Sequence, residues 1–262
     1  MDVDLFLQQF GHLAQGEGGI KKLRELVVYQ AVGGKFTTDQ KTEWITKSLG
    51  KIATFEYGKG LPAKARATGG TYPVYGSNGI VGYHDEALIH EPSIVIGRKG
   101  SAGALNIANK PFWPTDVTYY STPPKSIDLR FYFYLLSTLG LDKLGKGIKP
   151  GLNRNEAYRI TVSYPPLAEQ KRIVAKVDEL MALCDKLEAE QKNQRALKTQ
   201  AVQSTLHHLT SAESPASFGN SLNILERTYG NWFDDLATVK HLHATILQLA
   251  VQAKLVPQTP TD

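Results

Sequence analysis

The sequence contains a single cysteine, Cys184, and no apolar run long enough to cross a bilayer. One cysteine excludes an internal disulfide and a zinc site built from cysteines, so Cys184 is expected to be a small buried side chain. A membrane-spanning helix needs about 20 consecutive apolar residues. The N-terminal segment MDVDLFLQQF also lacks the basic start of a secretion signal. We therefore expect a cytoplasmic protein.

Motifs of catalysis and cofactor binding are missing as well. The glycines of residues 97–103 (GRKGSAG) and 145–151 (GKGIKPG) fit neither the dinucleotide fingerprint nor the phosphate-binding loop. In residues 163–167 (SYPPL), Tyr164 and Leu167 stand where the Asp/Asn-Pro-Pro-aromatic motif of amino-methyltransferases has its Asp or Asn and its aromatic residue. His207 and His208 have no carboxylate or cysteine at metal-ligand spacing. The sequence predicts no cofactor, no metal ion and no catalytic residue. The alternative is a free-standing methyltransferase or nuclease with an unrecognised site.

Positive charge is concentrated in the middle of the chain. The net charge is +5, but residues 44–166 hold 15 Lys and Arg against 8 Asp and Glu, a net of +7, which leaves −2 for the remainder. Such a surface suits a polyanionic partner. The same region is rich in short β-type runs bounded by glycine or proline, such as residues 93–97 and 116–122, with one helix expected over 128–141.

A long helix is expected after Pro165-Pro166. Residues 167–209 contain no proline or glycine. Apolar residues recur there at alternating steps of four and three, which is the spacing of a coiled-coil seam. The seam consists of Ile173, Val177, Leu180, Cys184 and Leu187. We expect it to be under-covered in a monomer, so that residues 167–210 self-associate into a homodimer or capture a partner subunit.

Two segments near the ends of the chain resemble each other. Residues 20–36 (IKKLRELVVYQAVGGKF) match residues 239–255 (VKHLHATILQLAVQAKL) in apolar class at a constant offset of 219 residues. The match predicts a repeated short helix, whose second copy packs on one face of the long helix. Residues 211–221 (SAESPASFGNS), rich in serine, with proline and glycine, are expected to form a flexible connection.

Four blocks in a fixed order carry a family resemblance. They are YPVYGSNGIVGY (72–83), SIVIGRKGSAG (93–103), FWPTDVTYYS (112–121) and PPLAEQKRIVAKVDEL (165–180). Together they resemble the specificity subunit of type I restriction–modification enzymes. In that family each target recognition domain reads one half of a bipartite DNA sequence. Long helices hold two such domains apart and dock methyltransferase (M) subunits, which the motor-nuclease (R) subunit joins.

The resemblance implies an α+β fold, in which a β-rich target recognition domain is followed by a long coiled-coil-like helix that packs against shorter helices. The expected parts are an N-terminal helix region (1–40), the recognition domain (41–166), the long spacer helix (167–210), and a linker with the second short helix (211–262). The chain holds one recognition domain, so we expect an N-terminal half or a natural half-subunit. A coiled-coil scaffold with a protein-binding β domain is the remaining alternative.

Glycine-rich loops with polar, aromatic and basic residues are the expected DNA-binding elements. Glycine allows the close approach of a backbone to phosphates, and Arg can hold both acceptors of a guanine. Simple β-turns or an exposed charged hairpin would show the same pattern. Asp116 is expected to cap a turn rather than to contact cytosine. The predicted DNA-binding residues are Tyr75, Ser77, Asn78, Arg98, Lys99, Ser101, Lys146, Lys149, Asn153 and Arg154, and the predicted partner-helix residues are Ile173, Val177, Leu180 and Leu187.

Overall fold

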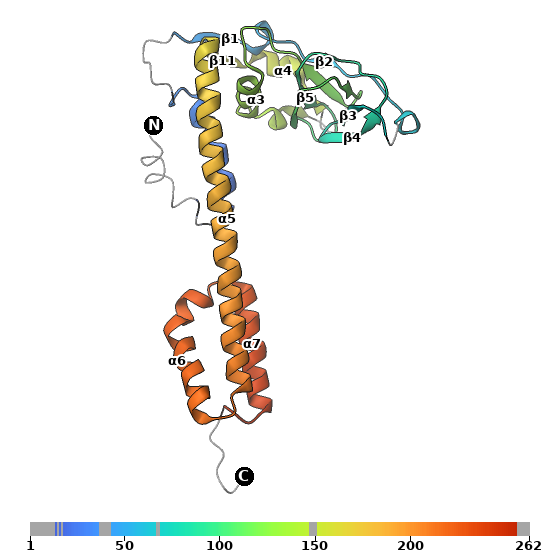
Figure 1. Ribbon diagram of the computed structural model, residues 1–262. Helices are drawn as coiled ribbons and strands as arrows, with labels where there is room; N and C mark the ends of the chain where they lie inside the picture. The colour runs from blue at the N-terminus through green and yellow to red at the C-terminus, as the bar shows by residue number, and fades with distance from the viewer. Residues whose placement is uncertain are drawn as a thin grey trace. The chain divides into compact units, whose positions relative to one another are not determined.

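The computed structural model describes residues 14, 16, 18–36, 43–66, 69–146 and 151–255, with only the backbone of residues 145 and 146. The chain divides into two compact units, Met1–Cys184 and Asp185–Asp262. Figure 1 shows the strands gathered in the first unit, whereas the second consists of helices. Within the described ranges, no helix has both the length and the apolar character that a membrane span requires.

The strands of the first unit form two main sheets and two short ribbons. One sheet has the order β2-β8-β5-β6 and is antiparallel throughout, and the other has the order β4-β3-β7. The ribbons are β1-β11 and β9-β10. The strands are β1 (Ile45–Ser48), β2 (Glu56–Tyr57), β3 (Tyr72–Gly76), β4 (Gly79–His84), β5 (Ser93–Gly97), β6 (Leu105–Ala108), β7 (Trp113–Pro114), β8 (Thr118–Ser121), β9 (Gly145–Lys146), β10 (Gly151–Leu152) and β11 (Thr161–Tyr164).

Strand β5 and helix α3 (Leu129–Ser137) form the centre of the β-rich domain. Every residue of β5 is buried, as expected for a β-branched run in the middle of a sheet. Helix α3 packs on β5 and β6, and the Tyr132 hydroxyl lies 2.9 Å from the Ser121 Oγ of β8. The helix predicted over 128–141 is therefore present but ends at Ser137. Shorter helical segments are η1 (Leu49–Lys51), η2 (Ala63–Ala65), η3 (Leu141–Leu144) and α4 (Arg154–Arg159).

The first and last strands of the domain pair with each other. Ile45 opposes Tyr164, and the hydroxyls of Thr46 and Ser163 lie 2.7 Å apart across the ribbon. This ribbon closes the domain between α2 (Gly19–Val32) and α5 (Leu167–Ser211). In both figures α2 runs beside the first half of α5.

The seam on the first half of α5 is covered within the chain. Ile173, Val177 and Leu180 are each at most 1% exposed. Helix α2 buries an apolar stripe in the same unit, which consists of Ile20, Leu23, Val27 and Ala31. The expectation of an under-covered seam is therefore wrong for these residues, because helix α2, the first copy of the short helix, lies beside this half of α5. Leu187 lies in the second unit and is partly exposed.

The second unit is built from residues 185–211 of α5, helix α6 (Pro215–Trp232) and helix α7 (Leu236–Val251). Its core packs the three helices together, which confirms that the second short helix contacts α5. The core consists of Val202, Leu206, Leu225, Trp232, Phe233 and Leu242. The Lys254 ammonium donates to the carbonyls of Thr210 (2.8 Å) and Ala212 (3.0 Å) at the C-terminus of α5. Lysine there satisfies carbonyls that the helix leaves unpaired.

The flexible connection predicted over 211–221 is wrong from Pro215 onward. Ser214 and Ser217 form a capping box, and Pro215 occupies the first turn of α6. Proline is tolerated at that position because its missing N–H would have no helical partner. With this correction, the α+β prediction is confirmed: a β-rich domain is followed by a long helix that packs against shorter helices.

Candidate nucleic-acid interface

Three loops that are far apart in the sequence meet at one edge of the β-rich domain. They are the β3–β4 turn (Ser77-Asn78), the loop after β5 (Arg98–Ser101) and the segment Gly151–Arg154, and we call them the loop cluster. The Leu152 N–H donates to the Arg98 carbonyl at 2.9 Å, and the backbone of Lys99 forms an isolated antiparallel β-bridge with Gly151. A Cβ at Gly97 would meet the Ser77 carbonyl at 2.6 Å, so only glycine fits this crossing.

Arg98 is held by the backbone and by aromatic rings. Its Nε and Nη2 donate to the Asp116 carbonyl at 3.1 and 2.7 Å. The guanidinium lies over the Tyr57 and Tyr119 rings, 5.2 and 6.0 Å from their centroids. One edge of the guanidinium is thus occupied, and the Nη1–Nη2 edge remains for a bidentate contact. For Asp116, the hydrogen-bond acceptor is the main-chain carbonyl rather than the capping carboxylate that the sequence suggested.

Arg154 lies on the same tyrosine as Arg98. Its guanidinium carbon lies 4.7 Å from the Tyr57 centroid, and Nη1 donates to the Phe55 carbonyl at 3.1 Å. Tyr57 is 52% exposed, and Lys59 is exposed two residues later. Both residues were missed in the sequence, although FEYGKG (55–60) has the glycine, aromatic and basic residues of the predicted loops. The loop cluster and the adjacent strand β2 therefore combine positive charge with an accessible aromatic ring.

The phenols beneath this surface stay protonated over a wide pH range. Burial is the largest cause, and a hydrogen bond with Tyr57 the second, that raises the pKa of Tyr119 to about 12. Burial, followed by a hydrogen bond to Glu56, raises the pKa of Tyr120 to about 12 as well. Tyr119 therefore presents a neutral ring to Arg98 at physiological pH.

The other predicted residues differ in how far they reach the surface. Asn78, Lys99 and Ser101 are exposed, and Ser77 is partly exposed. Asn153 is exposed, but its side-chain oxygen caps α4 by accepting from the Asn155 N–H at 3.0 Å. The backbone of Lys146 pairs with Gly151. Its side chain and the whole of Lys149 lie outside the described residues.

Tyr75 belongs to the core and not to the surface of the loop cluster. It is 8% exposed and packs with Val95, Ala108 and Phe112. Its hydroxyl donates to the Ile107 carbonyl at 3.4 Å, and burial raises its pKa. The structure therefore gives Tyr75 a packing role, which contradicts the exposure that a direct DNA contact requires. Ile80, Val81 and Tyr83 of the neighbouring edge strand β4 are the exposed apolar residues there.

A family model described as "Type I restriction modification DNA specificity domain" matches residues 41–197. The chain belongs to this family. The match covers the recognition domain with all three loops of the cluster, and continues into α5 as far as residue 197.

Three relatives of the chain are specificity subunits from Escherichia coli. The EcoAI specificity subunit is 37% identical over 101 residues, which are 38% of this chain and 17% of the relative. The EcoEI specificity subunit is 35% identical over 101 residues, with the same shares. The EcoprrI specificity subunit is 24% identical over 155 residues, or 57% of this chain and 39% of the relative. The chain thus spans less than half of the curated relatives that it matches.

One of two solved structures that resemble the chain supports its fold. A chain from a study of complex assembly and conformational transition of the type I R-M system has a TM-score of 0.53 at 19% identity, covering 73% of this chain and 53% of that one. The S subunit from M. genitalium has a TM-score of 0.46 at 16% identity, covering 73% of this chain and 52% of that one. At 19% identity, the likeness to the first of these structures supports the fold and nothing beyond it.

Proposed function

We propose that the chain is a non-catalytic DNA-specificity component of a type I restriction–modification complex, and that its recognition domain reads one half of a bipartite target in the cytoplasm. The observation that carries the proposal is the loop cluster: two of its loops bring Arg98 and Arg154 together over the exposed ring of Tyr57. Lys99, next to Arg98, forms a β-bridge with Gly151 of the other loop. Clustered cations suit DNA phosphates, and short polar side chains such as Asn78 suit base edges.

Within the cluster we assign different tasks to the basic residues. Lys99 is exposed and is proposed to contact phosphate. Arg98 has one guanidinium edge held by the Asp116 carbonyl, which fixes the direction of the other edge. A guanidinium edge with a fixed direction can donate to guanine O6 and N7 at the same time. Arg154 is proposed to support Arg98 through the shared Tyr57 ring and to add positive charge.

For the helical unit we propose docking of methyltransferase subunits, through which the motor-nuclease subunit would join. Exposed apolar residues support this proposal, because such patches mark protein contacts. They include Ile224, Tyr229, Leu236, Val239 and Ile246. A homodimer through α5 stays a prediction, but its original ground is lost because Ile173, Val177 and Leu180 are covered. Light scattering of the purified chain measures its oligomeric state.

DNA binding by the purified chain tests the proposed function. We expect affinity for duplex DNA to fall steeply as salt rises. Lys99→Ala should reduce the slope of log affinity against log salt by about 0.9, the value for one phosphate contact. Lys125→Ala is the matched control, since Lys125 is exposed beyond the opposite end of β8. A flat salt response, or equal effects of the two substitutions, would contradict the assignment.

Sequence reading is tested separately, by co-expression with methyltransferase subunits and mapping of the methylated adenines. Arg98→Lys keeps the charge but replaces the planar guanidinium fork, held here by the Asp116 carbonyl, with a flexible ammonium group. We expect it to relax preference at one base position, with a loss of about 1–3 kcal/mol on the specific sequence. Equal losses on specific and random DNA would make Arg98 a phosphate contact. Methylation by the isolated chain would contradict a non-catalytic role.

A further inference from the structure

Helix α3 contacts both the sheet of the recognition domain and the start of α5. On one side α3 packs on β5 and β6, and β5 leads directly into the loop cluster at Arg98. On the other side α3 makes two polar contacts with α5, one at Gln170 and one at Asp178. Any rotation of the domain about α5 must therefore break or carry these contacts.

The first contact is buried. Gln170 is 0% exposed, and its Oε1 accepts from the Asp128 N–H at 2.8 Å. Its Nε2 donates to the carbonyls of Ser126 (3.1 Å) and Pro165 (2.8 Å). One side chain thus joins the loop before α3, the end of the domain and the first turn of α5. Removing it would leave three backbone groups without this partner, and the loss is most costly at the Pro165 carbonyl, whose hydrogen bond is buried.

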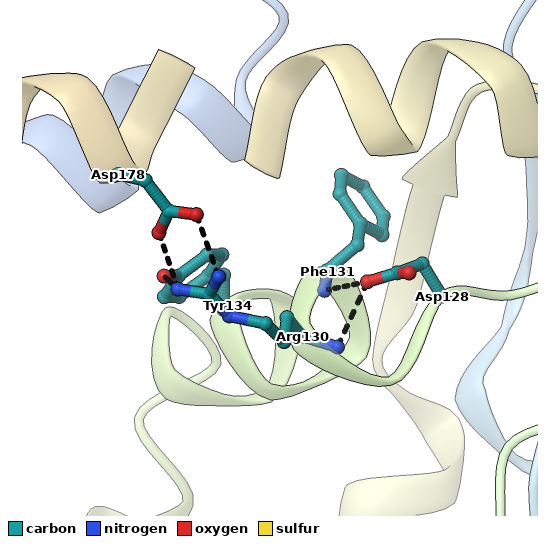
Figure 2. Close-up of polar contacts among 5 residues, drawn as sticks. All are labelled: Asp128, Arg130, Phe131, Tyr134 and Asp178. Carbon is teal, nitrogen blue, oxygen red and sulfur yellow. Dashed lines mark hydrogen bonds and ion pairs between the residues drawn. The ribbon is translucent and has the colours of Figure 1, made fainter. Parts of the chain in front are cut away.

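Asp128 extends this contact into α3. Its carboxylate is the N-cap of the helix and accepts from the N–H groups of Arg130 (2.9 Å) and Phe131 (3.1 Å), as Figure 2 shows. The residue that Gln170 holds by its backbone therefore also starts α3. The position of the α3 N-terminus is coupled to α5 through two consecutive sets of hydrogen bonds.

The second contact is a two-pronged ion pair. Arg130 Nη1 donates to Asp178 Oδ2 at 2.6 Å, and Nη2 donates to Asp178 Oδ1. Nη2 also donates to the Tyr134 hydroxyl at 3.0 Å on the next turn of α3. Figure 2 shows Asp178 of α5 pointing at this arginine. Such pairs are directional as well as attractive. The hydrogen bond with Asp178 is the main reason that the pKa of Arg130 is raised.

Two separated contacts fix a direction as well as a position. Asp178 follows Gln170 by eight residues, which is about 12 Å along an α-helix. A single contact would allow the domain to pivot, whereas two contacts at this separation oppose pivoting. We propose that α3 is a rigid joint that sets the angle of the recognition domain to α5, with Gln170 and the Arg130–Asp178 pair as its positioning residues. Its consequence, a fixed placement of the half-site along α5, rests on the proposed function.

Distance measurements between spin labels in the full chain test the joint. Labels are placed at Lys110→Cys, exposed after β6, and Ala182→Cys, exposed on α5, in a Cys184→Ala background. We expect one narrow distance peak for the parent chain. Gln170→Leu combined with Asp178→Ala should lose that peak while circular dichroism keeps the helical signal. Lys176→Ala, which breaks a pair with Glu179 within α5, is the matched control and should keep the peak. A narrow peak in the double variant would overturn the proposal.

A charge exchange covers the case in which the double variant fails to fold. Arg130→Asp alone should broaden the peak, and adding Asp178→Arg should narrow it again, because the pair is re-formed with its charges reversed. Failure of the second substitution to narrow the peak would overturn the role of the pair. DNA affinity is measured in the same samples. Loss of the narrow peak with unchanged single-site affinity supports the joint, whereas absence of DNA binding by the parent chain contradicts the proposed function alone.

Discussion

Helices α2 and α7 share one sequence pattern but lie in different surroundings. Val27 of α2 is fully buried, whereas Ile246, its match in α7, is 45% exposed. Ile20 and its match Val239 differ in the same way. Helix α7 instead buries Thr238, Thr245 and Leu249, which lie on another face. The repeated sequence therefore gives both helices apolar residues that can pack, while the neighbouring elements decide which face of each helix is buried.

The largest expected difference between the two helices is the cost of truncating the matched position. Val27→Ala removes two buried methyl groups and should lower the free energy of unfolding of the first unit by about 2–3 kcal/mol. Ile246→Ala removes more atoms but should change stability by less than about 0.5 kcal/mol, since Ile246 is half-exposed. Chemical denaturation, monitored by hydrogen exchange in each unit, measures the stability change that each of the two substitutions causes. Equal losses would show that α7 packs its repeat-equivalent face as α2 does.

The two units should also differ at alkaline pH. Burial raises the pKa of Tyr132 in the first unit, and the pKa of Tyr120 is about 12. An unfolded tyrosine loses its proton near pH 10, while the folded one keeps it. Between pH 10 and 12 the unfolded state thus binds fewer protons, so the free energy of unfolding falls as pH rises. Denaturation at several pH values should show this decline in the first unit. Tyr132→Phe should weaken it, and an unchanged slope would contradict this origin.

The second unit has the opposite sensitivity. A hydrogen bond from the Thr238 backbone N–H is the main cause that lowers the pKa of Asp235, the N-cap of α7. Its contribution is present above the ordinary pKa of 3.8 and is lost as pH falls through the lowered value. Asp235→Asn keeps an N-cap acceptor but does not titrate. Under acid conditions, the protection of the α7 amides against hydrogen exchange, relative to unfolded amides at the same pH, should therefore depend on pH more in the parent chain than in this variant.

The smallest expected effect compares two matched lysines. Lys254 donates to carbonyls at the end of α5, and its match Lys35 is exposed after α2. Lys254→Met should lower the stability of the second unit by about 0.3–1 kcal/mol, the usual range for a cation at a helix C-terminus. Lys35→Met should have less effect. A larger loss for Lys35→Met in matched denaturation curves would reverse this ranking.

Elements with a strong local pattern were predictable from the sequence. The run 93–97 is strand β5 with the same bounds, and the predicted helix 167–210 is α5 to within one residue. Residues 215–221 failed because proline and glycine were taken as a sign of flexibility, whereas Ser214 converts Pro215 into a helix start. A local pattern identifies an element best when all residues of the segment favour the same secondary structure.

Long-range partners were not predictable. The alternation in β3 does not say which side faces the core, so Tyr75 was assigned to the wrong side. The partner of Arg98 is a backbone carbonyl at residue 116, to which no side-chain motif points. The sequence offered two similar short helices as partners for the long helix, and only the folded chain shows that Ile173, Val177 and Leu180 are buried within the first unit. These outcomes depend on tertiary packing rather than on local preference.

The loop cluster is held together by its main chain, and this bears on how its side chains can vary. The Leu152 N–H binds the Arg98 carbonyl, and the Gly103 N–H binds the Gly97 carbonyl at 2.8 Å. None of these bonds depends on the exposed side chains of Asn78, Lys99 or Ser101. Substitutions at the exposed positions can therefore alter what the surface recognises while the frame beneath persists. Gly97 has no such freedom, so mutational tolerance should change sharply between neighbouring positions of one loop.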